Sequence, residues 1–101
     1  ELEAGWAPRL WESARNAKVL PGAPGFVDCS QGIDPLDLPA GTIDRTLGDV
    51  HPFGSPHYLL DPLNGLRVAE RVRDALITAR SGREGYFRER FGAFQDRLGA
   101  A

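Results

Sequence analysis

Prolines and glycines dominate the middle of this chain and limit what it can fold into. Between residues 31 and 56 the sequence contains four prolines and four glycines and shows no sustained helical or strand period. Proline fixes the backbone angle φ and glycine frees it, so such a segment can hold side chains in place without belonging to a regular element. A loop of this length in a compact domain usually has a function.

Both histidines of the chain lie near the end of this loop, in the stretch GDVHPFGSPHYLLDPLN at residues 48–64. His51 and His57 are six positions apart, and the prolines and glycine between them allow both side chains to face one point. Asp61-Pro62 predicts a helix start, with aspartate as the N-cap and proline at the first helical position. Imidazole is a ligand suited to zinc and acceptable to manganese or iron. His57 and His51 are therefore candidate metal ligands.

The two histidines do not complete a metal site by themselves. A lone histidine is more often a packing residue than a ligand, and zinc generally takes about four ligands. The chain contains no further histidine, and its single cysteine, Cys29, is distant in sequence and is expected to be a small buried residue. A complete site therefore needs carboxylates of this chain, residues outside these 101 positions, or another chain.

Length and composition indicate one soluble globular domain or part of one, with 101 residues, 42% hydrophobic and 26% charged. The net charge of −2 gives no reason to expect nucleic acid, and no apolar run approaches the roughly 18 residues of a membrane span. Residues 1–66 carry a net charge of −5 and residues 67–101 a net charge of +3, with alternating signs typical of solvated helix faces. The sequence lacks methionine and a leader-like segment, and we interpret it as an excerpt or a processed product.

Hydrophobic spacing predicts three helices, over residues 3–16, 62–80 and from about 83 to 98. Proline is tolerable only near the start of a helix, so the regular part of the first helix should begin at Ala7 or Pro8. Three glycines, Gly85, Gly92 and Gly99, lie in or directly after the third helix, and each costs it about 1 kcal/mol relative to alanine. We therefore expect its stability to depend on tertiary packing.

Two segments between the first two helices predict strands. Residues 26–30, FVDCS, have the composition of a short strand, and residues 42–47 form a weaker candidate. A lone strand needs neighbours, so a helix, a loop and a short strand are typical of a piece of an α/β sheet.

The segment SPHYLLDPLN at residues 55–64 resembles the N/D-P-H-x-W-L-D-P-x-N motif of the metal-specific solute-binding proteins of bacterial ABC importers, which carry zinc or manganese. The likeness covers essentially the whole chain. The initial ELE followed by a tryptophan-bearing helix is similar to the G-L-E-x-E-x-W segment of that family, and the two last predicted helices resemble those that lead to its interlobe helix. The chain departs from the family pattern at Leu59, where a tryptophan is common, and Tyr58 stands beside it.

This resemblance implies an α/β fold: a partial Rossmann-like (β/α) lobe of a two-lobed solute-binding protein, helix-rich with few short strands and a long metal-proximal loop. Residues 1–101 would be a fragment of the N-terminal metal-binding lobe and would run into the interlobe connecting helix at about 83–101. His57 matches the histidine ligand of that lobe, and His51 falls where many members have a histidine-containing loop. Asp61 matches an aspartate that we interpret as a helix cap and not as a ligand.

The function that the resemblance implies is capture of a divalent transition metal, zinc or alternatively manganese, for delivery to an ABC importer permease. The expected location is the periplasmic or extracellular face of the bacterial cytoplasmic membrane. The protein would be a monomer that coordinates its cargo without turnover, so it would not be an enzyme, and it would not bind nucleic acid. The metal would be a transported ligand.

The residues by themselves leave two alternatives open. One is a small zinc-dependent hydrolase in which the loop with both histidines supplies two ligands and a carboxylate such as Asp49 a third. The other is a helical interaction module that uses the aromatic stripe Phe87, Phe91 and Phe94. The sequence contains neither the G-x-S-x-G context of a nucleophilic serine nor a glycine-rich phosphate-binding motif.

Overall fold

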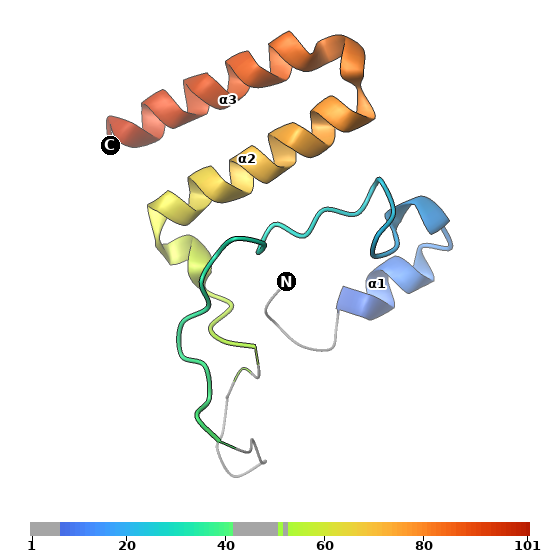
Figure 1. The fold of residues 1–101 in the computed structure, drawn as a ribbon, viewed down its shortest axis with the longest axis vertical. Coiled ribbons are helices and arrows are strands. Elements are labelled where there is room, and N and C mark those ends of the chain that lie inside the picture. The colour runs from blue at the N-terminus through green and yellow to red at the C-terminus, as the bar shows by residue number, and fades with distance from the viewer. Residues whose placement is uncertain (1–6, 42–50, 52) are drawn as a thin grey trace.

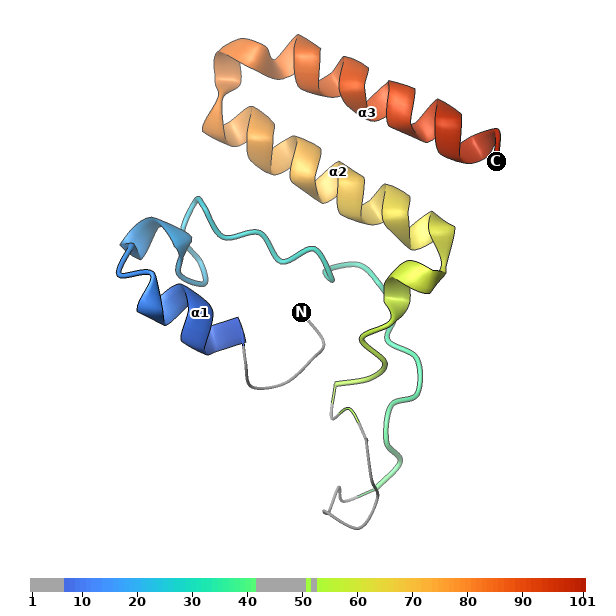
Figure 2. The same ribbon diagram turned by 180° about the vertical axis from the view of Figure 1, so that it is seen from behind.

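The computed structural model describes residues 7–41, 51 and 53–101. Its helical elements, in chain order, are α1 (Ala7–Ser13), the short 3₁₀ helices η1 (Ala17–Val19) and η3 (Tyr58–Leu60), α2 (Pro62–Ala79), the 3₁₀ helix η4 (Ser81–Arg83) and α3 (Glu84–Gly99). α2 and α3 form an antiparallel pair, and the loop after α1 passes along the other side of α2 (Figures 1 and 2). The fold is flat, with extents of 51 × 40 × 16 Å.

The first helix begins at Ala7, as expected from the position of Pro8. It ends at Ser13, earlier than the hydrophobic spacing indicated. α1 starts at Ala7, and residues 1–6 lie outside the described part of the chain. Arg15 has a φ of 48°, a left-handed conformation that does not continue a right-handed helix. Asn16 then starts η1, because its side chain accepts the backbone N–H of Lys18 at 3.0 Å.

α2 and α3 confirm the predicted second and third helices within one residue at each end. The predicted N-cap is also confirmed, because Asp61 Oδ1 accepts the N–H of Leu63 at 2.9 Å and Pro62 occupies the first turn. The two helices are connected by η4. Across their interface, the guanidinium carbon of Arg73 lies 4.5 Å from the centroid of the Phe91 ring, in a cation–π contact.

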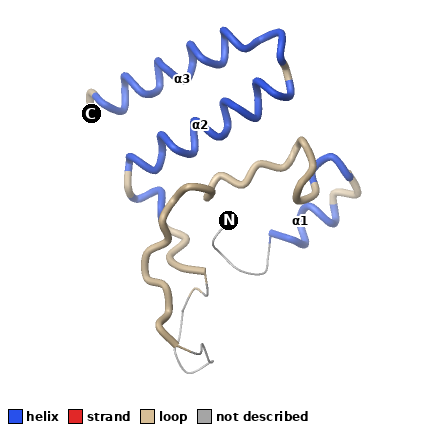
Figure 3. The backbone as a smooth tube through the Cα atoms, viewed as in Figure 1, coloured by secondary structure: helices blue, strands red, loops and turns tan. Residues whose placement is uncertain are grey.

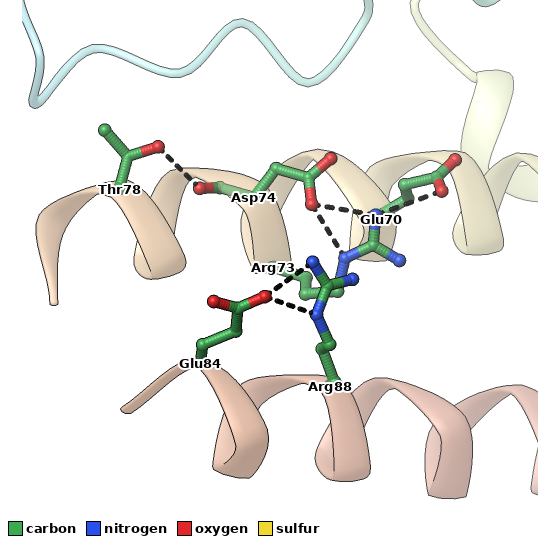
Figure 4. Close-up of polar contacts among 6 residues, drawn as sticks. All are labelled: Glu70, Arg73, Asp74, Thr78, Glu84 and Arg88. Carbon is green, nitrogen blue, oxygen red and sulfur yellow. Dashed lines mark hydrogen bonds and ion pairs between the residues drawn. The ribbon is translucent and has the colours of Figure 1, made fainter. Parts of the chain in front are cut away.

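Charged pairs lie along the hairpin of α2 and α3 (Figure 4). Arg73 donates to Glu70 at 3.1 Å and to Asp74 at 2.8 Å, and Arg88 pairs with Glu84 at 2.8 Å. The hydrogen bond from Arg73 lowers the pKa of Asp74 below its ordinary value. Each pair lies within a single helix, and the two pairs spaced three and four residues apart stabilise their helix locally.

The predicted α/β class is wrong for the part of the chain that the structure describes: no strand occurs in it, and a Rossmann-like lobe requires a sheet (Figure 3). Of residues 26–30, predicted as a strand, the first three have no regular secondary structure and the last two lie in a turn. The Asp28 carboxylate accepts the backbone N–H of Ser30 at 3.0 Å and its hydroxyl at 2.6 Å. Such local pairing competes with extended structure, and the described residues offer no neighbouring strand. The other predicted strand, residues 42–47, lies outside them.

Few side chains are buried within the described residues. Ala7 and Ile33 are the buried apolar ones there, at 5% and 7% exposure. Trp11 packs edge-on against Phe26, with ring centroids 5.3 Å apart, and thereby connects α1 to the following loop. Cys29 is half-buried, not fully buried as predicted. The radius of gyration, 16.5 Å, exceeds the roughly 13 Å of a compact domain of this length.

None of the helices in the described ranges combines the length and apolar character that crossing a membrane requires. This finding agrees with the hydropathy of the sequence.

Candidate metal-binding site

The two residues predicted as metal ligands, His51 and His57, lie beside each other. Their ring centroids are 5.9 Å apart and the rings are nearly perpendicular, at 86°. A zinc–nitrogen distance of about 2.0 Å and a tetrahedral angle place the centroids of two ligating imidazoles about 5 Å apart. The observed centroid separation exceeds this value by about 1 Å, so the two rings are near enough for a shared ion once their nitrogens face it. His51 is half-buried and His57 is exposed.

His57 also lines a pocket of about 380 Å³ at the start of α2. Apolar side chains of Leu36, Tyr58 and Leu60 form part of its wall. The other polar side chains of the pocket come from both sides of the loop and from α2: Asp34, Ser55, Asp61, Asn64 and Arg67. Imidazole, hydroxyl and carboxylate groups together suit a divalent cation of borderline softness. His51 does not line this pocket.

Close backbone contact fixes the chain before His57, in a segment that we call the His57 loop (residues 53–57). The N–H of Ser55 donates to the Leu36 carbonyl at 2.8 Å, and Ser55 Oγ accepts the N–H of His57 at 3.4 Å. Gly54 has a φ of 92°. A Cβ at Gly54 would lie 2.7 Å from the Pro35 Cβ and 2.8 Å from the Leu36 carbonyl oxygen. Glycine is therefore required for this approach of the two segments.

The chain after His57 is fixed by the first turns of α2. His57 is the residue before η3, and Asn64 Nδ2 donates to the carbonyl of Tyr58 at 2.9 Å. Further along α2, the Arg67 guanidinium donates to the carbonyl of Gly32. The same helix thus contacts both the residues that follow His57 and the segment on which the His57 loop rests.

Asn64 and Arg67 are site residues that the motif did not single out, although a signal for them exists. Together with Asp61 they recur every three residues over the first turns of the predicted helix, so they lie near one side of it. Asp34 carries no comparable signal, because only the fold brings its segment beside the helix. Its position in the pocket was therefore not predictable from spacing.

The described residues contain no group of three or more histidine, cysteine, aspartate or glutamate side chains placed to hold a metal ion. The two histidines are thus part of a coordination sphere at most, and a four-coordinate zinc ion would take its other ligands from elsewhere. Asp49, the third ligand of the hydrolase alternative, lies outside the described residues.

No model of a known protein family, no curated protein and no solved structure matches this chain. The resemblance of residues 55–64 to importer proteins therefore stays a prediction, as does the assignment of the chain to an N-terminal lobe. A function has to be argued from the side chains around His57 and from the sequence motif.

Proposed function

We propose that this chain captures a divalent transition metal, zinc in the first place with manganese as the alternative, and delivers it to an ABC importer permease outside the cytoplasmic membrane. One observation supports the metal-binding part: His51 and His57 place their rings 5.9 Å apart, with the chain on both sides of His57 held in position. Delivery to a permease is supported by the resemblance of residues 55–64 to solute-binding proteins.

The proposed chemistry is coordination without turnover. His57 binds the ion through a neutral imidazole nitrogen, and the two carboxylates of Asp34 and Asp61 outweigh the single positive charge of Arg67 in the same pocket. Acid weakens binding, because a protonated imidazole has no lone pair left for the metal. The coordination positions that the two imidazoles leave open are filled by groups outside the described residues, and a second lobe of the same protein is the source that the resemblance implies.

Replacing each histidine tests the proposal by zinc calorimetry on protein stripped of metal with a chelator. His57→Ala should weaken zinc binding by more than the roughly 10- to 100-fold typical of losing an outer-shell partner. His51→Ala should cause a milder loss, of about ten-fold. Arg80→Ala, at the opposite end of α2, serves as a control and should leave the affinity unchanged.

An unchanged dissociation constant in His57→Ala would contradict the proposal. Full affinity in His51→Ala would make that residue a packing partner of His57 and not a ligand. The metal content of the protein as isolated, together with competition between zinc and manganese, identifies the cargo. Hydrolysis of an ester or amide by the zinc-loaded protein would contradict coordination without turnover.

A further inference from the structure

We infer that Arg67 is a positioning residue for the metal site: it holds the segment on which the His57 loop rests against the helix that follows His57. This inference rests on the proposed metal-binding function. It adds a side chain that fixes where the imidazole lies, without itself being a ligand.

The contact of Arg67 reaches a segment with a defined conformation. Its guanidinium donates to the carbonyl of Gly32, which has a φ of 81°. The next residue, Ile33, is one of the two buried apolar residues of the described chain, and its N–H donates to the carbonyl of Ser30 at 3.1 Å. Arg67 therefore binds to a turn whose conformation is already fixed by a hydrogen bond and by the buried side chain of Ile33. Its contact consequently also restricts the residues that follow Ile33 in the chain.

That segment is connected to His57 by two hydrogen bonds through Ser55, of which the second is long. The Leu36 carbonyl accepts the N–H of Ser55 at 2.8 Å, and Ser55 Oγ accepts the N–H of His57 at 3.4 Å. The approach at Gly54 leaves no room for a Cβ between the two segments. In this series of contacts from α2 to His57, Arg67 makes the first contact through its side chain. The later contacts involve backbone groups and the hydroxyl of Ser55.

The helix also holds His57 from its other side. Residues 58–61 join His57 to α2, and Asn64 braces them by donating to the Tyr58 carbonyl at 2.9 Å. With both connections present, the imidazole is fixed relative to α2 from two directions. Without the Arg67 contact, the direct hydrogen bond from α2 to the carbonyl of Gly32 is lost, while residues 58–61 and Asn64 still join His57 to the helix. The side chain of Arg67 is exposed, so its removal should leave the helix itself intact.

Because Arg67 is positively charged, a positioning role and an electrostatic role predict opposite changes in metal affinity when its side chain is removed. A guanidinium that lines the pocket of His57 repels a bound divalent cation, so its removal would tighten metal binding if charge were its main effect. If position is its main effect, its removal weakens binding. Lysine at this position keeps the charge and can donate to the same carbonyl, so it should preserve most of the affinity.

The test is zinc calorimetry on the full chain carrying Arg67→Ala, Arg67→Lys or the control Arg80→Ala. Arg67→Ala should weaken zinc binding about ten-fold, Arg67→Lys should recover most of that loss, and Arg80→Ala should bind as the wild type does. Cobalt in place of zinc gives a second readout. Its visible absorption should change in Arg67→Ala, because the ligand geometry shifts, while the helical circular dichroism stays the same.

Wild-type or tighter zinc binding in Arg67→Ala would overturn the inference and leave the proposed function intact, since His57→Ala reports on that function separately. A loss of helical signal in Arg67→Ala would also overturn it, by showing a role in folding α2. If the wild-type protein bound no zinc, the proposed function would fail first. Hydrogen exchange then decides the positioning role: the Ser55 amide should lose protection in Arg67→Ala, and unchanged protection would refute the inference.

Discussion

The α2–α3 hairpin and the region around His57 are stabilised by contacts of different range. Within the hairpin, Arg73 pairs with Glu70 three residues away, and Arg88 pairs with Glu84 four residues away. Around His57, the hydrogen bond from Arg67 joins residues 35 positions apart in the chain. Contacts of the first kind form from neighbouring sequence, whereas those of the second kind require the loop to close first.

The two regions also differ in what a single contact does. A charged pair on a helix face contributes at most about 1 kcal/mol, and the backbone hydrogen bonds hold the helix without it. Near His57 the apolar side chains of Leu36 and Leu60 are 71% and 86% exposed, so apolar burial adds little. Position there depends on a few polar contacts and on one glycine. Substitutions around His57 should therefore have larger effects than substitutions in the hairpin.

Gly54→Ala is expected to have the largest effect. The new Cβ would collide with Pro35 and with the Leu36 carbonyl, and φ at this position is 92°. Left-handed backbone in alanine and a forced separation of two packed segments together cost about 3 kcal/mol. Urea unfolding followed by circular dichroism measures the loss in free energy of unfolding, and zinc affinity should fall as well.

Gly92→Ala is the matched control in the hairpin. Nothing lies within 4 Å of a Cβ added at this helical glycine, so alanine should raise the free energy of unfolding by about 1 kcal/mol. Effects of opposite sign at the two glycines would sharpen the contrast between the regions. If Gly54→Ala were as stable as the wild type, the close approach of the two segments would not hold in solution.

Asp61→Ala tests the junction between the two regions. Its carboxylate accepts the N–H of Leu63 at 2.9 Å and caps α2, so its removal should cost about 1 kcal/mol of unfolding free energy. Asp61→Asn is the matched control and should retain most of the cap, since asparagine is an equally good N-cap residue. Equal losses in both variants would show that the negative charge matters more than the hydrogen bond.

Arg73→Ala should cost about 1 kcal/mol, well below the loss in Gly54→Ala, because it removes two ion pairs and the contact over Phe91 of a side chain that is 14% exposed. The pKa of Asp74 is lowered in the folded state by its hydrogen bond from Arg73, so this contribution is present above the ordinary carboxyl pKa. It disappears as the pH falls through the lowered folded-state value. Unfolding measured against pH should therefore show a weaker acid dependence in Arg73→Ala. A loss at neutral pH as large as that of Gly54→Ala would contradict the contrast.

The helices were predictable because their signals are local. Asp61-Pro62 marks the start of α2, and apolar spacing marks the length of α2 and α3, so both were placed within one residue of their ends. The prediction of a strand at residues 26–30 was wrong, because a segment of strand-like composition does not form a strand unless another strand pairs with it. The Asp28 carboxylate satisfies the N–H and the hydroxyl of Ser30 instead.

By itself, the sequence determined which residues could carry the chemistry and where two helices lie, since residue type, capping and periodicity act over a few positions. It placed His51 and His57 on one Pro/Gly-rich segment and could not say how far apart their rings are. Only the tertiary structure decided that separation, and only it brought Asp34 and Arg67 to the same pocket. The physical reason is that these placements depend on loop closure between distant segments, which no local pattern in the chain records.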